Sequence, residues 1–156
     1  ALYSGIAGGG DVILIPEIQY DEKVIAEYLV SRFRENKVYS IMVVAEGIKT
    51  PAKEEPAARY LSRRIAELTG IETRETVLGY IQRGGTPSPM DRVLATRYGA
   101  AAADLIANKE YGKMVALRNN EITSVPLSEV AGKLKFVDPA HPLVIKAKNM
   151  GTSFGD

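Results

Sequence analysis

The sequence predicts an α/β protein, because segments typical of buried strands alternate with segments typical of helices. Two continuous apolar runs, residues 11–17 (DVILIPE) and 38–46 (VYSIMVVAE), have the composition of strands that are buried on both faces. Between them, from Asp21 onward, apolar residues recur at helical spacing. Strands that alternate with helices in this way form a parallel sheet with right-handed crossovers.

The helices are predicted from their spacing and from their ends. Residues 1–9 are typical of a helix tail closed by glycines. Asp21 is placed to cap the helix that follows it, and Gly70 is placed to stop the next helix. The alanine-rich residues 88–110 predict a long helix, and residues 141–151 predict a short one.

The other segments predict strands and loops. Residues 73–79 (TRETVLG) favour a third strand, and residues 113–127 favour two extended pieces around an Asn-Asn turn. Residues 47–57 form a polar loop with two prolines. Lysines and arginines in polar contexts are expected to lie in solvent: Lys37, Lys53, Arg63 and Arg64.

The composition is that of an ordinary globular protein. Hydrophobic residues make up 46% and charged residues 25% of the 156 residues, enough for one domain with a sizeable core. A net charge of +1 argues against a nucleic-acid partner. The lack of cysteine excludes disulfides and thiolate metal sites, and it suits a cytoplasmic location. No apolar run approaches the roughly 20 residues of a membrane-spanning helix, so no membrane partner is expected.

Ligands of parallel sheets collect at the carboxyl ends of the strands. Glu17 follows the first predicted strand, Glu46 follows the second, and residues 79–85 follow the third. Glu46 can cap the next segment or accept hydrogen bonds from a polyol, and the first role is the more ordinary one. His141 is the only histidine, and without an evident partner it is interpreted as structural.

Two arginines flank the third predicted strand. Arg74 and Arg83 lie about 30 Å apart if the chain between them is fully extended. The planar guanidinium group binds phosphate oxygens bidentately, so the pair is a candidate anion site, particularly where two chains meet. Gly84 and Gly85 would let a ligand approach the backbone next to Arg83. The alternative is a pair of solvated surface arginines beside a plain turn.

The residues that carry a family resemblance surround these arginines. Residues 75–97 (ETVLGYIQRGGTPSPMDRVLATR) closely resemble the signature segment of 6-phosphofructokinases, and the likeness continues over residues 8–17, 41–47 and 115–122. It implies a three-layer α/β/α fold with a parallel sheet, in a fragment that covers parts of two domains. It also implies the domain limits: 1–81 in the sugar-phosphate-binding domain, 82–137 as the return segment of the donor-binding domain, and 138–156 as the crossover helix and tail.

The resemblance implies an activity and a set of substrate contacts. Family enzymes transfer a phosphoryl group from a donor, which we expect to be ATP here, to the 1-hydroxyl of fructose 6-phosphate in glycolysis, giving fructose 1,6-bisphosphate. Glu46 matches the carboxylate that binds the fructose hydroxyls, and Arg83 matches an arginine on the sugar phosphate. Arg74 matches an arginine that reaches the 6-phosphate across a subunit interface. Tyr80 stands where many members have a histidine, which leaves its role open.

The resemblance also marks an effector region. Gly9 and Asp11 match a loop that binds a nucleotide through Mg²⁺ in bacterial members, and Lys37 retains one basic phosphate contact. Glu35 and Val38 stand where further basic residues are expected. Since each lost cation weakens phosphate binding, we expect weak or no regulation by nucleoside diphosphates.

The general base and the donor loop of the family lie N-terminal to the matched region, so catalytic residues and Mg²⁺ ligands are expected outside this chain. The chain also starts without an initiator methionine, and we expect an inactive fragment of a longer protein. The expected partners are fructose 6-phosphate, ATP or pyrophosphate, and further copies in a homotetramer or homodimer. Two alternatives remain: a pyrophosphate-dependent phosphofructokinase, and a non-catalytic sugar-phosphate-binding module.

Overall fold

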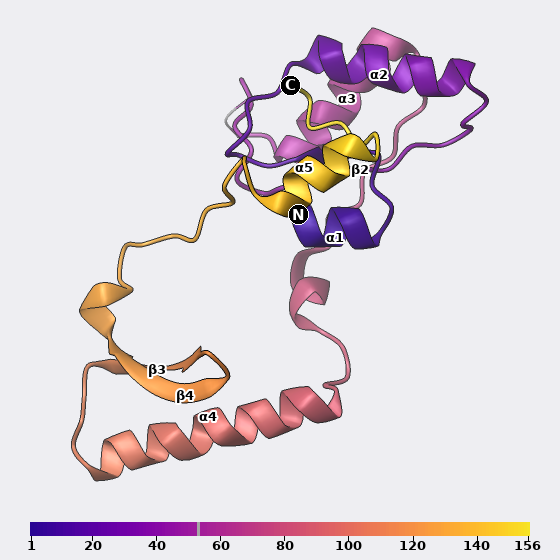
Figure 1. Ribbon diagram of the computed structural model, residues 1–156. Helices are drawn as coiled ribbons and strands as arrows, with labels where there is room; N and C mark the ends of the chain where they lie inside the picture. The colour runs from indigo at the N-terminus through magenta and orange to yellow at the C-terminus, as the bar shows by residue number, and fades with distance from the viewer. Residues whose placement is uncertain (53) are drawn as a thin grey trace. The chain divides into compact units, whose positions relative to one another are not determined.

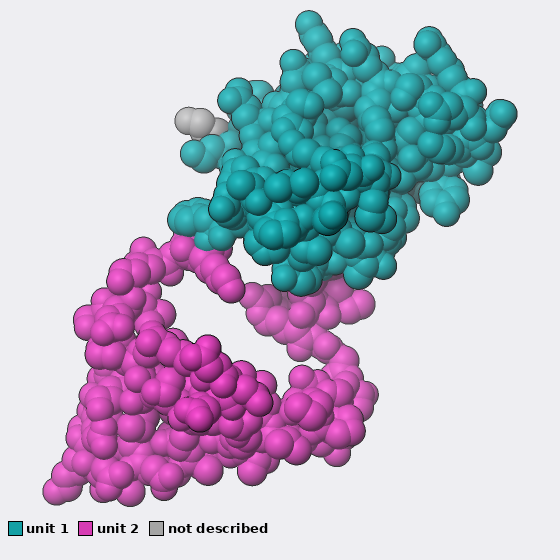
Figure 2. All heavy atoms as spheres, viewed as in Figure 1, with its two compact units in different colours: residues 1–77, 136–156 teal, residues 78–135 magenta. Residues whose placement is uncertain are grey.

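The computed structural model describes residues 1–52 and 54–156, so Lys53 of the predicted loop lies outside the described residues. The chain forms two compact units (Figure 2). Unit 1 comprises residues 1–77 and 136–156, and unit 2 comprises residues 78–135. The sequence predicted limits after residues 81 and 137, whereas the units divide after residues 77 and 135. The assignment of the units to a sugar-phosphate side and a donor side stays a prediction.

Unit 1 is built on two parallel strands, β1 (Val12–Leu14) and β2 (Met42–Val44). Their register pairs Val12 with Met42 and Leu14 with Val44. The C-terminal tail joins the other edge of β1 through a parallel bridge between Val12 and Ser153. The chain that returns from unit 2 therefore extends the sheet of unit 1, in which β1 lies between β2 and the tail.

Four helices cover the sheet of unit 1 (Figure 1). They are α1 (Leu2–Ala7), α2 (Glu22–Arg34), α3 (Ala57–Thr69) and α5 (Pro142–Asn149). Side chains alternate along a strand, so β1 feeds two separate cores. Val12 and Leu14 pack among residues of α2 and α3, whereas Ile13 packs with residues of α1 and α5. This arrangement confirms the predicted α/β class with a parallel sheet between helices.

The ends of α2 and α3 follow the predicted signals. The Asp21 carboxylate accepts a hydrogen bond from the backbone N–H of Lys23 at 2.7 Å, as an N-cap does. Gly70 ends α3 in the left-handed conformation at φ 71°, which a residue without a Cβ adopts at no steric cost. Both predictions are confirmed.

Unit 2 consists of one long helix and one hairpin. Its elements are η1 (Gly79–Arg83), α4 (Pro89–Ala107), β3 (Lys113–Arg118), β4 (Glu121–Pro126) and η2 (Leu127–Glu129). Ser88 and Asp91 form a reciprocal capping box at the start of α4. The predicted Asn-Asn turn is confirmed, with Asn119 and Asn120 both at positive φ between antiparallel strands. Val125 is the one buried hydrophobic residue among the described residues of unit 2.

The strand prediction for residues 73–79 is wrong, and the one for residues 38–46 is too long. Only residues 42–44 of the second run belong to a strand. Residues 72–77 make no backbone–backbone hydrogen bond to any described residue. A β-branched run favours an extended backbone, but a strand forms only where another backbone pairs with it. Val77 accordingly remains 68% exposed.

Within residues 1–52 and 54–156, no helix has both the length and the apolar character that a membrane crossing requires.

Candidate functional site

The carboxyl ends of β1 and β2 place two glutamates at one edge of the sheet. Because the strands are parallel, Glu17 and Glu46 follow them on the same side. Glu17 is partly buried, and its Oε1 accepts a hydrogen bond from the backbone N–H of Val137 at 2.9 Å. Its Oε2 is buried without a partner among the described residues. Glu17 thus serves to fix the returning chain.

Glu46, by contrast, is exposed. The described part of the chain provides no hydrogen bond or ion pair to its carboxylate. A free carboxylate at this edge can accept hydrogen bonds from a ligand's hydroxyl groups. Among the described residues, no contact supports the capping role that the sequence left open for Glu46.

Arg74 lies in the unpaired segment that leaves α3, and its side chain is 87% exposed. Its guanidinium group contacts Glu72, through Nε at 3.0 Å and Nη2 at 2.8 Å. Both bonds go to the same oxygen, Oε1, and the Glu72 side chain is itself 77% exposed. An exposed ion pair of this kind contributes at most about 1 kcal/mol, so a phosphate can displace Glu72.

Thr73 and Glu75, which flank Arg74, are residues that sequence reasoning missed. Both contact α3, Thr73 through Ser62 and Glu75 through Arg59. The signal that could have found them is the spacing of two, which places both side chains on the same side of an extended backbone.

The other two predicted substrate contacts belong to unit 2. Tyr80 and Arg83 both lie in η1, where the Tyr80 side chain is 92% exposed and Arg83 is exposed. Gly85 adopts φ 103°, a conformation that glycine tolerates and other residues rarely adopt. The predicted contacts are thus distributed over both units, Glu46 and Arg74 in unit 1, and Tyr80 and Arg83 in unit 2.

The predicted effector residues surround the end of α2. Asp11 binds Arg32 through Oδ1, at 2.6 Å from Nη2, and its Oδ2 accepts the backbone N–H of Ile41 at 2.8 Å. Lys37 pairs with Glu35 at 2.8 Å in an exposed position. Gly9, two residues after the end of α1 at Ala7, adopts φ 68°. A cation at Asp11 would have to replace the Arg32 guanidinium group, and the effector role stays a prediction.

The described residues do not fit a Mg²⁺ site. They contain no group of three or more His, Cys, Asp or Glu side chains that could hold a metal ion together. Mg²⁺ is bound through carboxylates and substrate phosphates in octahedral geometry. No chemical step is therefore assigned to a metal ion bound by these residues.

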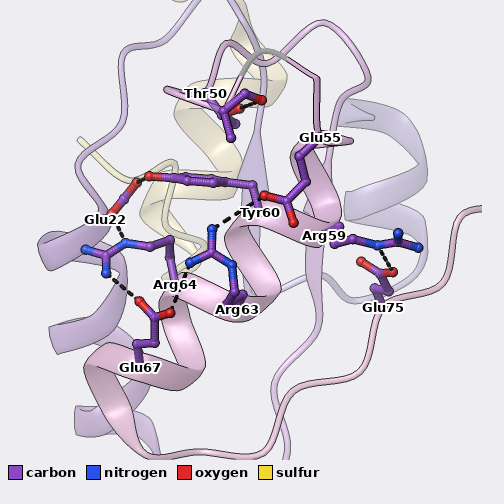
Figure 3. Close-up of polar contacts among 10 residues, drawn as sticks. Glu22, Thr50, Glu55, Arg59, Tyr60, Arg63, Arg64, Glu67 and Glu75 are labelled. Carbon is purple, nitrogen blue, oxygen red and sulfur yellow. Dashed lines mark hydrogen bonds and ion pairs between the residues drawn. The ribbon is translucent and has the colours of Figure 1, made fainter.

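The polar face of α3 carries a connected network of charges (Figure 3). Arg64 binds Glu67 at 2.6 Å and Glu22 of α2 at 3.0 Å, and Glu22 also accepts a hydrogen bond from the Tyr60 hydroxyl group at 2.7 Å. The hydrogen bond from Arg64, followed by that from Arg63, holds the pKa of Glu67 below its ordinary value. The network joins α2 to α3. Arg63 and Arg64 are therefore paired at the surface and not merely solvated.

Comparison with known proteins identifies the family. The sequence model of the family described as phosphofructokinase matches residues 1–106. An ATP-dependent 6-phosphofructokinase 3 of Bacteroides thetaiotaomicron is 57% identical over 155 residues, which covers 99% of this chain and 46% of the relative. A pyrophosphate–fructose 6-phosphate 1-phosphotransferase of Streptomyces coelicolor is 45% identical, over 90% of this chain and 45% of its own length.

The solved structures agree with the sequence comparison. The phosphofructokinase of Saccharomyces cerevisiae matches with a TM-score of 0.65 and 34% identity, over 83% of this chain and 18% of that one. The chain spans about half the length of the curated relatives that it matches. From its matched segments and its α/β/α layers, the chain belongs to the phosphofructokinase family.

Proposed function

We propose that the chain is the C-terminal portion of a 6-phosphofructokinase that transfers a phosphoryl group from ATP to the 1-hydroxyl of fructose 6-phosphate. The observation that carries this proposal is the 57% identity, over 99% of the chain, to a protein named as an ATP-dependent 6-phosphofructokinase. The products are fructose 1,6-bisphosphate and ADP, as in glycolysis.

The proposed role of this chain is to hold the acceptor sugar. Arg74 donates N–H groups to the 6-phosphate, and its exposure beside one weakly held partner supports this role. Glu46 accepts hydrogen bonds from the fructose hydroxyl groups, and its unengaged carboxylate at the strand edge supports that role. Arg83 and Tyr80 contribute from η1, where both side chains are accessible.

In the transfer, the 1-hydroxyl oxygen forms a bond to the γ-phosphorus while the bond from that phosphorus to the bridging oxygen of ADP breaks. The proton of the hydroxyl group passes to a base that we place outside this chain. Positioned arginines lower the barrier by holding the sugar in line and by compensating charge. The isolated chain, with acceptor contacts alone, should be inactive.

Membership in the family implies a divalent metal requirement in general. We propose Mg²⁺, held mainly by residues outside this chain, because the described residues offer no suitable group. We also propose a homotetramer or homodimer, in which Arg74 reaches the sugar phosphate of a neighbouring subunit. The cytoplasm stays the proposed location, on the ground that the chain contains no cysteine.

A pyrophosphate donor is the second candidate. The observation that favours it is the 45% identity to a protein named for pyrophosphate-dependent transfer. Assays of the full-length protein with each donor separate the two: turnover with ATP alone supports the first proposal, and turnover with pyrophosphate alone supports the second. A non-catalytic sugar-phosphate-binding module would show turnover with neither donor but saturable binding of fructose 6-phosphate.

The acceptor site is tested by Arg74→Ala in the full-length protein. Loss of a charge-assisted contact costs about 1.5–3 kcal/mol, so the KM for fructose 6-phosphate should rise roughly tenfold or more. Arg34→Ala is the matched control, because Arg34 is also exposed but lies at the end of α2. An unchanged KM in Arg74→Ala would contradict the assignment.

A further inference from the structure

The segment that carries Arg74 is held in place by side chains and not by a β-ladder. Residues 72–77 make no backbone–backbone hydrogen bond to any part of the chain that is described, yet unit 1 continues through residue 77. An extended segment without ladder bonds is free to move unless other contacts fix it. The direction in which Arg74 points therefore depends on the side chains beside it.

The first of these contacts joins Thr73 to Ser62 of α3. The Thr73 hydroxyl group donates to the backbone carbonyl of Ser62 at 2.8 Å, and the two hydroxyl oxygens lie 2.9 Å apart. Since Thr73 has one hydroxyl proton, and it is used on the carbonyl, Ser62 Oγ must be the donor between the hydroxyl groups. The pair is partly buried, so water competes less for it than at a fully exposed site.

The second contact joins Glu75 to Arg59, one helical turn before Ser62 (Figure 3). Arg59 Nε donates to Glu75 Oε1 at 2.9 Å. The Glu75 side chain is 27% exposed, much less than the Arg59 side chain at 64%. The hydrogen bond and charge of Glu75 raise the pKa of Arg59.

The spacing of the two contact residues on α3 is similar to the spacing of their partners on the segment. Arg59 and Ser62 are three residues apart on one face of α3, about 4.5 Å along the helix axis. Thr73 and Glu75 are two residues apart on one side of the extended segment, about 6.6 Å along it. The segment runs antiparallel to α3, and the long Arg59 side chain spans the remaining distance. This double attachment leaves Arg74, between the two anchors, on the side that faces away from α3.

We propose that Thr73 and Glu75 are positioning residues, which anchor the segment to α3 so that Arg74 is presented outward to a phosphorylated sugar. The inference rests on the proposed function, because it takes the phosphate group of the sugar as the ligand of Arg74. It goes beyond that function in naming what holds the arginine. Without the anchors, binding would have to order the segment each time, which weakens affinity.

A purely electrostatic effect and a positioning role predict opposite changes in phosphate binding when Glu75 is replaced. Removing the negative charge of Glu75 beside Arg74 would strengthen phosphate binding if only long-range electrostatics mattered, whereas removing the positive charge of Arg59 would weaken it. Positioning predicts that both changes weaken binding. It also predicts that the double variant is no worse than either single one, because each residue acts through the other.

The experiment uses the full-length enzyme and compares Glu75→Gln, Arg59→Gln and the double variant. The KM for fructose 6-phosphate should rise about threefold in all three, with kcat and the KM for the donor unchanged. Arg63→Gln is the matched control, since Arg63 is an exposed arginine on α3 that pairs with Glu55 and Glu67 instead. It should leave the KM unchanged.

Thr73→Val and Thr73→Ser test the other anchor without changing charge. Valine removes the hydroxyl group and should raise the KM for fructose 6-phosphate about threefold. Serine keeps the hydroxyl group, so its KM should equal that of the unmodified enzyme. A thermal melt of each variant checks that it is folded. A KM that changes only together with kcat and Tm would overturn the inference, because it would indicate a general structural role.

The measurements distinguish a failure of the positioning role from a failure of the proposed function. If Glu75→Gln lowers the KM, or leaves it unchanged while Arg74→Ala raises it, the positioning role is wrong and the proposed function stands. If Arg74→Ala itself leaves the KM unchanged, the proposed function is wrong and this inference falls with it.

Discussion

Replacement of Asp11 by alanine tests whether this carboxylate fixes the fold of unit 1. In the structure the Asp11 carboxylate joins the end of α2 to the start of β2, through Arg32 Nη2 at 2.6 Å and the Ile41 backbone N–H at 2.8 Å. Alanine removes both contacts at once. It leaves the Ile41 N–H and Arg32 Nη2 without their acceptor, while Arg32 Nε still donates to Ser40 Oγ at 3.0 Å.

The magnitude follows from the burial of the pair. Breaking a fully buried ion pair costs about 3–5 kcal/mol, whereas an exposed pair contributes less than about 1 kcal/mol. The side chains of Arg32 and Asp11 are 15% and 17% exposed, so some water reaches the orphaned groups. We expect Asp11→Ala to lower the free energy of unfolding by about 2–3 kcal/mol. Asp11→Asn keeps an acceptor for the Ile41 N–H, so its free energy of unfolding should fall by about half as much.

The assay is urea denaturation followed by the helical circular dichroism signal. Lys37→Ala is the control, because Lys37 forms an exposed pair with Glu35 and should change the free energy of unfolding by less than about 0.5 kcal/mol. A loss of less than about 1 kcal/mol in Asp11→Ala would refute the reasoning from burial. It would leave the Asp11 carboxylate available for the predicted effector.

Two more predictions concern packing and pH. Gly155→Ala should destabilise the fold by about 2 kcal/mol, since an added Cβ would lie 2.7 Å from Tyr20 Cβ at φ +80°. Gly70→Ala, with left-handed φ but open space, should cost only about 1 kcal/mol in the same urea titration. The lowered pKa of Glu67 means that its pairing, chiefly with Arg64, stabilises the fold above pH 4.5 and is lost as the pH falls through the folded-state value. In Glu67→Gln, the free energy of unfolding should therefore fall less steeply as the pH is lowered below 4.5 than in the unmodified protein. Parallel curves for the two proteins would contradict this.

Local chemistry along the chain determined much of the fold. The N-cap at Asp21, the stop at Gly70 and the Asn119-Asn120 turn each depend on residues within a few positions, so the sequence is sufficient to predict them. The signature segment likewise carries the family resemblance in contiguous residues. Glu46 and Arg74 could be singled out from residue type and from place along the chain.

Contacts between distant residues were decided by the tertiary structure alone. The run at residues 73–79 has the composition of a strand, but whether another backbone lies beside it depends on the whole fold, and none does among the described residues. The ion-pair partner of Asp11, Arg32, is 21 positions away, and Glu75 and Thr73 beside Arg74 contact Arg59 and Ser62 on a preceding helix. Propensity and capping act over a few residues, whereas such pairings form only in the packed chain. The sequence was therefore sufficient to single out Arg74, but not the contacts beside it.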